Sequence, residues 1–211
     1  MPETKQERAA VSTGKLLDAA ANLVAERGYE RTTLAAIGDR AGYTHGLVTA
    51  RFGSKEGLLW ALIERMVVDW SKDHLAYELQ GTSGADAIHG LVREMRKSWR
   101  AKSQHMKALY VLMFEALLPV PLLNERMREL HRSQRAGLEK TINAAMAAGT
   151  VSPDVDSAAV ARLIVGALRG AAYQAMLDPR EVPIKRALED VDMLIDALLP
   201  PPGAARPQVE G

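Results

Sequence analysis

The amino-acid sequence predicts an all-α protein in which a small N-terminal domain of three helices is followed by a larger helical bundle. Along nearly all of the chain, apolar residues recur three or four positions apart, which is the period of a helix with one buried face. Valine, isoleucine and threonine never alternate with polar residues over the length of a strand. Apolar residues make up 47% of the 211 residues, which is enough for a sizeable core.

Three helices are predicted in the N-terminal part, and each has a recognisable start or stop. Gly28 ends the first, because glycine suits the residue that closes many helices. Thr33 and Thr44 are suited to cap the second and third, since a threonine hydroxyl accepts a hydrogen bond from a free N–H of the first turn. The tight turn Gly42-Tyr43-Thr44 joins these two short helices into a helix-turn-helix unit. The three predicted helices end at residue 27 and span 34–41 and 45–51.

The rest of the chain is predicted to form a helical bundle with a disordered tail. Loops are indicated by a stretch rich in Gly, Ser and Thr at 80–84, by Pro119 and Pro121, by Gly149 and by Asp178-Pro179. The predicted helices span 55–79, 85–102, 106–118, 122–148, 156 or 157 to 177, and 184–199. The predicted domains are a helix-turn-helix domain at 1–55, a helical domain at 56–199, and a tail at 200–211 that we expect to be disordered.

The composition excludes several classes of function. Cysteine is absent, which rules out disulfides, thiolate metal sites and cysteine nucleophiles and suits a reducing cytoplasm. The five histidines are scattered without the spacing of a metal motif, so no metal or other cofactor is expected. Residues 1–14 are too charged for a signal peptide, and no apolar run is long enough to span a membrane. The net charge of +1 leaves nucleic-acid binding open.

The second short helix of the helix-turn-helix unit has a small, hydroxylated outer face. Val48 and Phe52 share one side of a helical wheel and are expected to pack inward, since so short a helix is unstable alone. The remaining face can approach base edges closely in the major groove of DNA. The residues on that face and its flanks are His45, Gly46, Leu47, Thr49 and Ala50.

Positive charge is concentrated around this unit. Between residues 31 and 55 the cations are Arg31, Arg40, Arg51 and Lys55, against the single anion Asp39. This footprint suits phosphates, and Lys55 lies at a predicted helix N-terminus, where free N–H groups also favour an anion. Pairs of short capped helices are common in all-α proteins, so the pattern by itself leaves DNA binding open.

A dense set of motifs covers residues 16–59. An Ala-rich first helix ends in Glu-Arg-Gly-Tyr, and Thr-Thr precedes a helix of small residues that ends in Ala-Gly. Tyr-Thr-x-Gly, the junction Phe-Gly-Ser-Lys-Glu and Leu-Leu follow. In these features the stretch resembles the DNA-binding region of the TetR family of repressors. The resemblance implies a homodimer, a palindromic operator in double-stranded DNA, and a C-terminal domain that releases the DNA when it binds a small-molecule effector.

The resemblance also implies roles for single residues. Thr33 and Thr44 match positions that contact phosphates. Lys55 matches a lysine that holds a phosphate beyond the recognition helix. The positions that match base-facing residues are His45, Gly46 and Leu47.

The chain departs from the family pattern at three positions. Thr49 stands where tyrosine is common, Arg51 where histidine or tyrosine is common, and Gly38 where alanine is usual. Loss of the tyrosine removes a phosphate contact. Arg51 is a candidate to supply that contact, although its helix position points partly inward, so Thr49 and Arg51 rank below Lys55 as DNA contacts.

The last two predicted helices are suited to pair with a second copy of the chain. The helix at 157–177 is rich in alanine and glycine, whose small side chains let helices approach closely. The last helix carries an apolar stripe that includes Leu188, Val191 and Ile195. On pattern alone both faces suit an intrachain core equally well. The resemblance favours a two-fold four-helix interface between subunits.

The middle helices supply apolar side chains for an effector pocket, which is expected to be mostly apolar with a few polar groups. Methionine adapts to varied shapes and so suits such a cavity. A stripe of aromatic residues and methionine is also ordinary core, and the pattern does not separate the two readings. We expect an apolar or amphipathic effector. The candidate residues are Trp99, Met106, Tyr110, Met113, Phe114, Met127 and Tyr173.

An all-α enzyme and a helical protein-binding scaffold are the alternative classes. The sequence has no Glu-x-x-His pair of the kind found in di-iron bundles, no Gly-rich phosphate loop and no His-Glu-x-x-His motif. No catalytic residue is therefore assigned. Either alternative predicts that the protein protects no site on its own upstream DNA.

Overall fold

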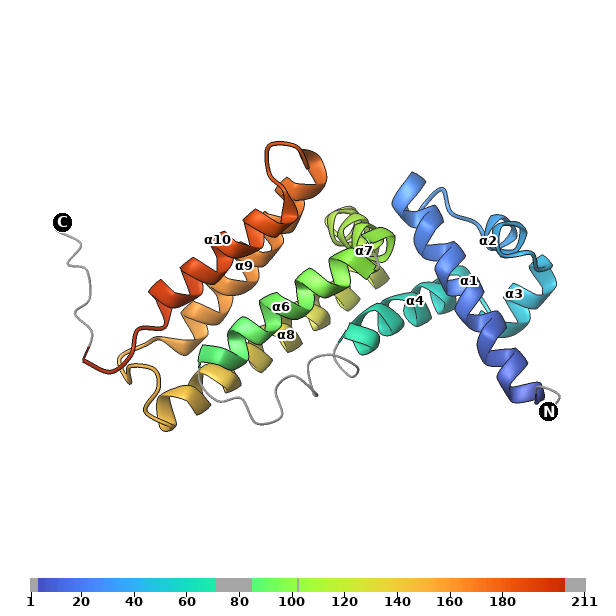
Figure 1. Cartoon of the computed structure of the whole chain (residues 1–211). Coiled ribbons are helices and arrows are strands. Elements are labelled where there is room, and N and C mark those ends of the chain that lie inside the picture. Colours follow the sequence, from blue (N-terminus) through green and yellow to red (C-terminus); the bar gives the residue numbers. More distant parts are fainter. Residues whose placement is uncertain (1–3, 71–84, 102, 204–211) are drawn as a thin grey trace. The chain divides into compact units, whose positions relative to one another are not determined.

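The structure, a computed structural model, describes residues 4–70, 85–101 and 103–203, and every regular element in these ranges is an α-helix (Figure 1). The predicted all-α fold class is therefore confirmed. The helices are α1 (Lys5–Arg27), α2 (Leu34–Ala41), α3 (His45–Phe52), α4 (Lys55–Trp70), α6 (Ala85–Ala101), α7 (Ser103–Glu115), α8 (Pro121–Ala147), α9 (Ser157–Leu177) and α10 (Ile184–Leu198).

The helices group into two compact units. The first unit comprises Met1–Ser71 and Ser98–Met127, so it contains α1 to α4, α7 and the first residues of α8. The second comprises Lys72–Lys97 and Arg128–Gly211, which hold most of α6, the rest of α8, and α9 and α10. The helix-turn-helix thus shares its unit with α7, which packs directly on α1. The division of function predicted after Lys55 stays a prediction.

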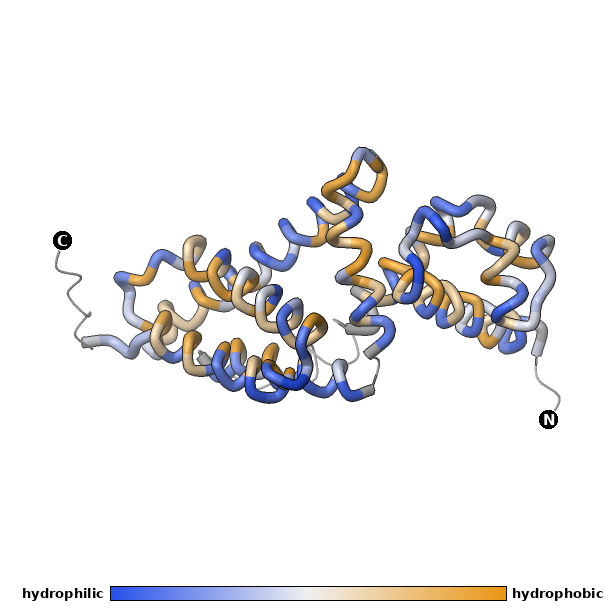
Figure 2. The backbone as a smooth tube through the Cα atoms, turned by 90° about the horizontal axis from the view of Figure 1, so that it is seen from above, coloured by the Kyte–Doolittle hydropathy of each residue, from blue (hydrophilic) through white to orange (hydrophobic). Residues whose placement is uncertain are grey.

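α1 is the central helix of the first unit. Its start is fixed by a capping box in which the Thr4 hydroxyl accepts from the Glu7 N–H and the Glu7 carboxylate accepts from the Thr4 N–H. Leu16 and Ala20 are fully buried, and α2, α4 and α7 all pack against this helix. The alanines of α1 allow these close approaches because they add little bulk. Figure 2 shows how hydrophobic and hydrophilic residues alternate along the helices.

The second unit is built on the pairing of α9 with α10. The two helices pack against each other, and Ile164, Leu188 and Ile195 are fully buried. Asp156 caps the start of α9, because its carboxylate accepts from the Ala159 N–H at 2.9 Å. Leu188, Val191 and Ile195, whose stripe was expected to pair with a second copy, are therefore part of the intrachain core, and other faces of both helices stay exposed.

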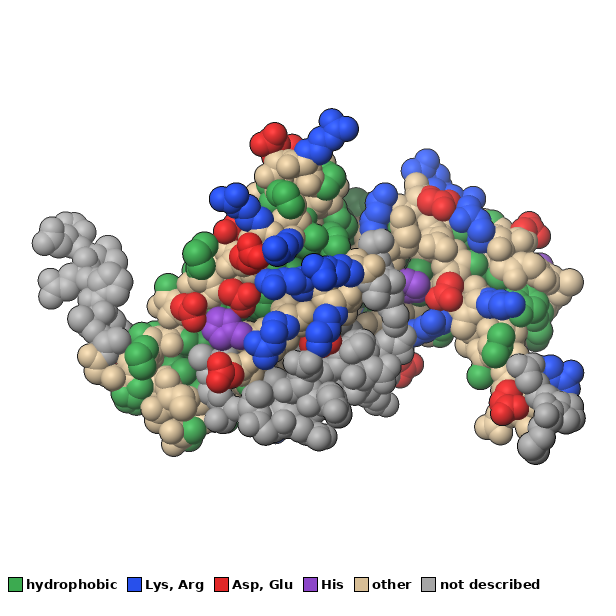
Figure 3. All heavy atoms as spheres, in the orientation of Figure 1, with side chains coloured by type: hydrophobic (Ala, Val, Ile, Leu, Met, Phe, Trp, Pro, Cys, Tyr) green, Lys and Arg blue, Asp and Glu red, His purple; other side chains and the backbone are tan. Residues whose placement is uncertain are grey.

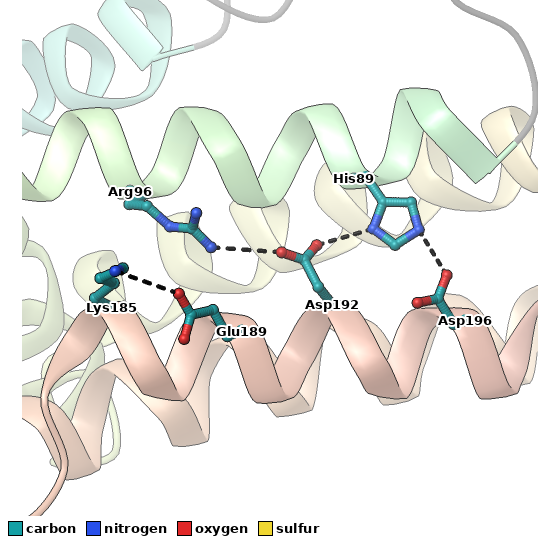
Figure 4. Close-up of polar contacts among 6 residues, drawn as sticks. All are labelled: His89, Arg96, Lys185, Glu189, Asp192 and Asp196. Atoms are coloured by element: carbon teal, nitrogen blue, oxygen red, sulfur yellow. Dashed lines mark hydrogen bonds and ion pairs between the residues drawn. The ribbon is translucent and has the colours of Figure 1, made fainter.

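A polar cluster joins α6 to α10 inside the second unit (Figure 4). His89 lies between two carboxylates, with Nδ1 2.9 Å from Asp192 and Nε2 3.1 Å from Asp196. Arg96 Nη2 lies 3.5 Å from the other oxygen of Asp192. A histidine ring that carries a proton on each nitrogen donates a hydrogen bond to both carboxylates. Figure 3 shows basic side chains gathered along α6 beside acidic side chains of α10, so charge complementarity extends along this pair.

The helix boundaries differ from the prediction chiefly at α7. The predicted range was 106–118, but the helix runs from Ser103 to Glu115. Residues before a proline avoid helical conformation, and Pro119 restricts Leu118 in this way. Leu117 is 80% exposed, so no burial stabilises a further turn. The helix predicted at 55–79 is present as far as Trp70, and its remainder lies outside the described residues, as does the tail beyond 203.

Candidate nucleic-acid interface

The turn between α2 and α3 depends on two glycines. Gly42 is in the left-handed region, with φ 77° and ψ 30°, a conformation that costs glycine little. The following N–H, of Tyr43, donates to the Gly38 carbonyl at 2.8 Å and closes the turn. A Cβ atom at Gly38 would lie 2.7 Å from the Tyr43 carbonyl oxygen. This close approach of the backbone accounts for glycine at the position where the resemblance leads one to expect alanine.

The recognition helix α3 is held by one buried side chain. Val48 is fully buried, whereas His45, Gly46 and Ala50 are exposed. Phe52 and Leu47 are half-buried. Since a helix of this length is not stable by itself, its orientation depends on the packing of Val48 against the first unit. Between His45 at the start of α3 and Arg51 near its end, the exposed residues are the small Gly46 and Ala50.

Two threonine hydroxyls begin the two helices. Thr33 Oγ1 accepts from the Ala36 N–H at 3.2 Å, and Thr44 Oγ1 accepts from the Leu47 N–H at 3.3 Å. Both side chains are exposed. A hydroxyl that accepts in a cap keeps its own proton to donate. Each threonine can therefore cap its helix and donate to an anion in solvent at the same time.

Lys55 is held in place by two groups from the segment after α1. Its Nζ donates to the Glu30 carbonyl at 2.9 Å and lies 4.2 Å from the centre of the Tyr29 ring. Burial, and then the charges of Glu56 and Glu30, raise the pKa of Tyr29 to about 12, so its phenol stays neutral. An ammonium has three protons, so the carbonyl leaves two of them to donate to a phosphate.

The arginines near the turn contribute less free charge than the sequence indicates. Both terminal guanidinium nitrogens of Arg40, Nη1 and Nη2, donate to Glu26, each at 2.9 Å, and this pair lowers the pKa of Glu26. Arg51 Nη2 donates to Ser12 of α1 at 3.3 Å. The Thr49 hydroxyl is buried and makes no hydrogen bond. As folded, therefore, the Thr49 hydroxyl does not face solvent.

The candidate effector residues fall in different environments. Trp99, Met106 and Met113 are half-buried, whereas Phe114 is 49% exposed on α7. Tyr173 belongs to the second unit and is 43% exposed. Among the seven, the two that are almost completely buried are Tyr110 and Met127. A role for these residues in effector binding stays a prediction.

Polar residues of α7 are engaged with α1. His105 Nε2 lies 3.0 Å from Asp18, which also pairs with Arg65 of α4 at 3.1 Å. Glu115, at the other end of α7, accepts from the Tyr29 N–H at 2.8 Å. Sequence reasoning missed these contacts because each joins residues distant in the chain. Within the ranges that the structure describes, no three histidine, cysteine or acidic side chains are grouped to hold a metal ion.

His131 makes the stability of the second unit depend on pH. Burial, and then the charges of Arg169 and Arg135, lower the pKa of His131. As the pH falls below about 6.5, the unfolded chain binds a proton that the folded chain does not, so stability falls. We expect His131→Gln to flatten this slope in denaturant titrations at pH 7.5 and 5.5. His45→Gln, at an exposed histidine, serves as the control, and an equal loss of slope there would contradict the assignment.

Comparisons with known proteins agree with this fold. The family model for bacterial regulatory proteins of the tetR family matches residues 16–62. The model for the C-terminal domain of BetI-type transcriptional repressors matches residues 85–200, more than half of the chain. A search of curated proteins finds no significant match. None of the helices described between residues 4 and 203 has the length and apolar character needed to cross a membrane.

Solved structures with the same fold include known regulators. SmeT, the repressor of the Stenotrophomonas maltophilia multidrug efflux pump SmeDEF, has a TM-score of 0.71 and 22% identity, covering 93% of this chain and 96% of that chain. The complex of SmeT with triclosan has a TM-score of 0.76 and 24% identity, covering 95% of this chain and 99% of that chain. A protein from Saccharomonospora viridis in complex with choline has a TM-score of 0.75 and 18% identity, covering 89% of this chain and 96% of that chain.

The capped helix-turn-helix, matched by the family models over both parts of the chain, identifies a DNA-binding transcriptional regulator. The two matched family models together span most of the described helices. The chain belongs to the TetR family of bacterial regulators, with a C-terminal domain of the BetI type. The resemblance found in residues 16–59 is thereby confirmed.

Proposed function

We propose that the protein is a homodimeric repressor that binds a palindromic operator and leaves it when a small apolar or amphipathic molecule binds the helices after α4. The protein acts by binding and not by catalysis, and its place of action is the cytoplasm, where bacterial DNA lies. The observation that carries the proposal is the exposed face of α3 with Lys55 beside it. Lys55 is held by the Tyr29 ring and the Glu30 carbonyl.

Contacts to phosphates position the protein, and contacts to bases choose the sequence. We assign the phosphates to Thr33, Thr44 and Lys55, because each is a hydrogen-bond donor at a helix start. His45, Gly46 and Leu47 form the part of α3 assigned to the bases. The small side chains on the exposed face of α3 support this assignment, because they let the backbone of the helix approach the bases in the major groove. Arg51 ranks lower, since its guanidinium is bonded to Ser12.

The proposed dimer uses an exposed apolar stripe of α9 and α10. Leu163 is 53% exposed, Leu177 72% and Met193 63%, although all three are large apolar side chains. Gly166 and Gly170 lie between them on α9, and a Cβ at either would meet no atom within 4 Å. An apolar stripe interrupted by glycines lets a second helix approach closely. Tyr173, a candidate effector residue, lies on this same stripe and is better explained by it.

The effector class is supported by the half-buried methionines of α7 and by the relatives. Met106 and Met113 provide an adaptable apolar lining. Structural relatives bind triclosan in one case and choline in another, so this fold accommodates small organic molecules of different charge. We favour an apolar or amphipathic molecule because the candidate residues are aromatic or contain sulfur.

The proposal is tested by footprinting the purified protein on its own upstream DNA at low salt. A protected palindrome is the expected result. Compounds that raise the melting temperature of the protein are then added to the complex and are expected to remove the protection. If no site is protected at any salt concentration, an enzyme or a protein-binding scaffold becomes the better reading. If only small hydrophilic compounds bind, the proposed effector class is wrong.

Replacing Lys55 with alanine is expected to weaken binding to all DNA sequences alike. One phosphate contact fewer lowers the slope of log K against log salt by about one unit. The slope is measured by fluorescence anisotropy between low and moderate salt. Lys140→Ala, at an exposed lysine of α8, serves as the control and leaves the slope unchanged. An unchanged slope in Lys55→Ala removes this residue from the interface.

A further inference from the structure

The C-terminal end of α7 reaches the segment that follows α1. Glu115 Oε2 accepts a hydrogen bond from the backbone N–H of Tyr29 at 2.8 Å, although the two residues are 86 positions apart. The bond is partly buried and joins a carboxylate to an amide, which makes it stronger than a bond between neutral groups. Both residues belong to the first compact unit, so the contact is internal to one body.

The backbone before Tyr29 is shaped to receive this carboxylate. Gly28 has φ 83° and ψ 167°, a combination that is essentially restricted to glycine. A Cβ atom at Gly28 would collide with the carboxylate oxygen of Glu115. The absence of a side chain therefore serves two purposes: it allows the backbone to turn, and it leaves room for Glu115 to reach the next N–H.

The same segment holds the proposed phosphate anchor. The Tyr29 ring, whose residue is only 6% exposed, lies under the Lys55 ammonium at 4.2 Å. The carbonyl of the next residue, Glu30, accepts from Lys55 Nζ at 2.9 Å. Both groups that hold Lys55 thus come from two consecutive residues, and the first of these is bonded through its backbone to Glu115.

We propose that Glu115 is a positioning residue for DNA binding, which sets the place of Lys55 by holding the Tyr29–Glu30 segment. The inference rests on the proposed role of Lys55. It gives α7, which also carries the candidate effector residues Met106, Tyr110 and Met113, a direct connection to the phosphate anchor. A displacement of the end of α7 would then withdraw the support of Lys55.

The test is a double-mutant cycle on the full chain, with a labelled duplex selected by the protein from a random-sequence library. Lys55→Ala is expected to weaken binding by about threefold to tenfold, as for one phosphate contact. Glu115→Ala is expected to weaken binding by about threefold in the native background and not at all when Lys55 is already alanine, because residues coupled through a shared backbone segment are not additive. Glu115→Gln retains an oxygen that accepts from Tyr29 and is expected to restore most of the affinity.

The possible results separate the role of Glu115 from the role of Lys55. Equal losses from Glu115→Ala in both backgrounds would show that Glu115 supports the fold in general, and the inference would be wrong. No loss from Lys55→Ala alone would contradict the role of Lys55 in the proposed function instead. Glu125→Ala, at an exposed glutamate of α8 in the same unit, is the matched control and leaves affinity unchanged. Circular dichroism establishes that each variant is folded at the temperature of the titration.

Discussion

Replacing Gly166 with arginine is expected to turn the dimer into a monomer and to weaken operator binding by about 100-fold or more. A dimer on a palindrome binds its second half-site intramolecularly, which adds a factor of about 10²–10⁴ to the affinity. Gly166 lies on the exposed face of α9, between Leu163 and Tyr173. An arginine there places a long charged side chain in the proposed apolar contact and holds the second copy away.

The protomer itself has room for this change. No atom lies within 4 Å of a Cβ built at Gly166, and arginine is a better helix former than glycine by up to about 0.8 kcal/mol. The matched control is Gly137→Arg on α8, where a Cβ also meets no atom within 4 Å. Sedimentation at micromolar concentration is expected to give a monomer for Gly166→Arg and a dimer for Gly137→Arg. A dimeric Gly166→Arg variant would place the interface elsewhere.

The local features of the DNA-binding helices could be predicted because their signals are local. Thr33 and Thr44 cap helices through atoms three residues away, and Gly42 takes the left-handed conformation that the turn requires. Such signals are complete within a short stretch of sequence. The start and end of α7 could not be predicted as well, because Leu117 and Leu118 continue the apolar pattern although the chain turns before Pro119.

The electrostatics of the site could be predicted only in part. Counting charges between residues 31 and 55 includes Arg40 but omits its partner Glu26, which lies 14 positions away on α1. The support of Lys55 by Glu30 spans 25 positions, and the bond of Glu115 to Tyr29 spans 86. Pairings at such distances depend on how helices pack, and a pattern of residue types carries no record of them.

Gly28 illustrates the difference, because the sequence marks it only as a helix stop. Gly28→Ala is expected to destabilise the first unit by about 3 kcal/mol. About 1–3 kcal/mol comes from a backbone conformation that alanine avoids. A further 1–3 kcal/mol or so is lost because the new methyl group displaces Glu115 and leaves the N–H of Tyr29 without its acceptor. Urea denaturation measures the loss, and DNA affinity is expected to fall with it because Lys55 depends on the same segment.

Gly149→Ala is a control for the cost of a positive φ without a displaced side chain. Gly149 also has a positive φ, of 71°, but a Cβ there meets no atom within 4 Å. Only the backbone cost applies at this position, and it is about 1 kcal/mol for a single residue in the left-handed region. The loss in Gly28→Ala is expected to exceed that in Gly149→Ala, both because φ 83° with ψ 167° is essentially restricted to glycine and because the carboxylate of Glu115 is displaced. In a chain that already carries Glu115→Ala, Gly28→Ala is expected to cost only its backbone contribution, since the Tyr29 N–H has already lost its acceptor. If the two substitutions are instead additive, the close fit between Gly28 and Glu115 does not contribute to stability.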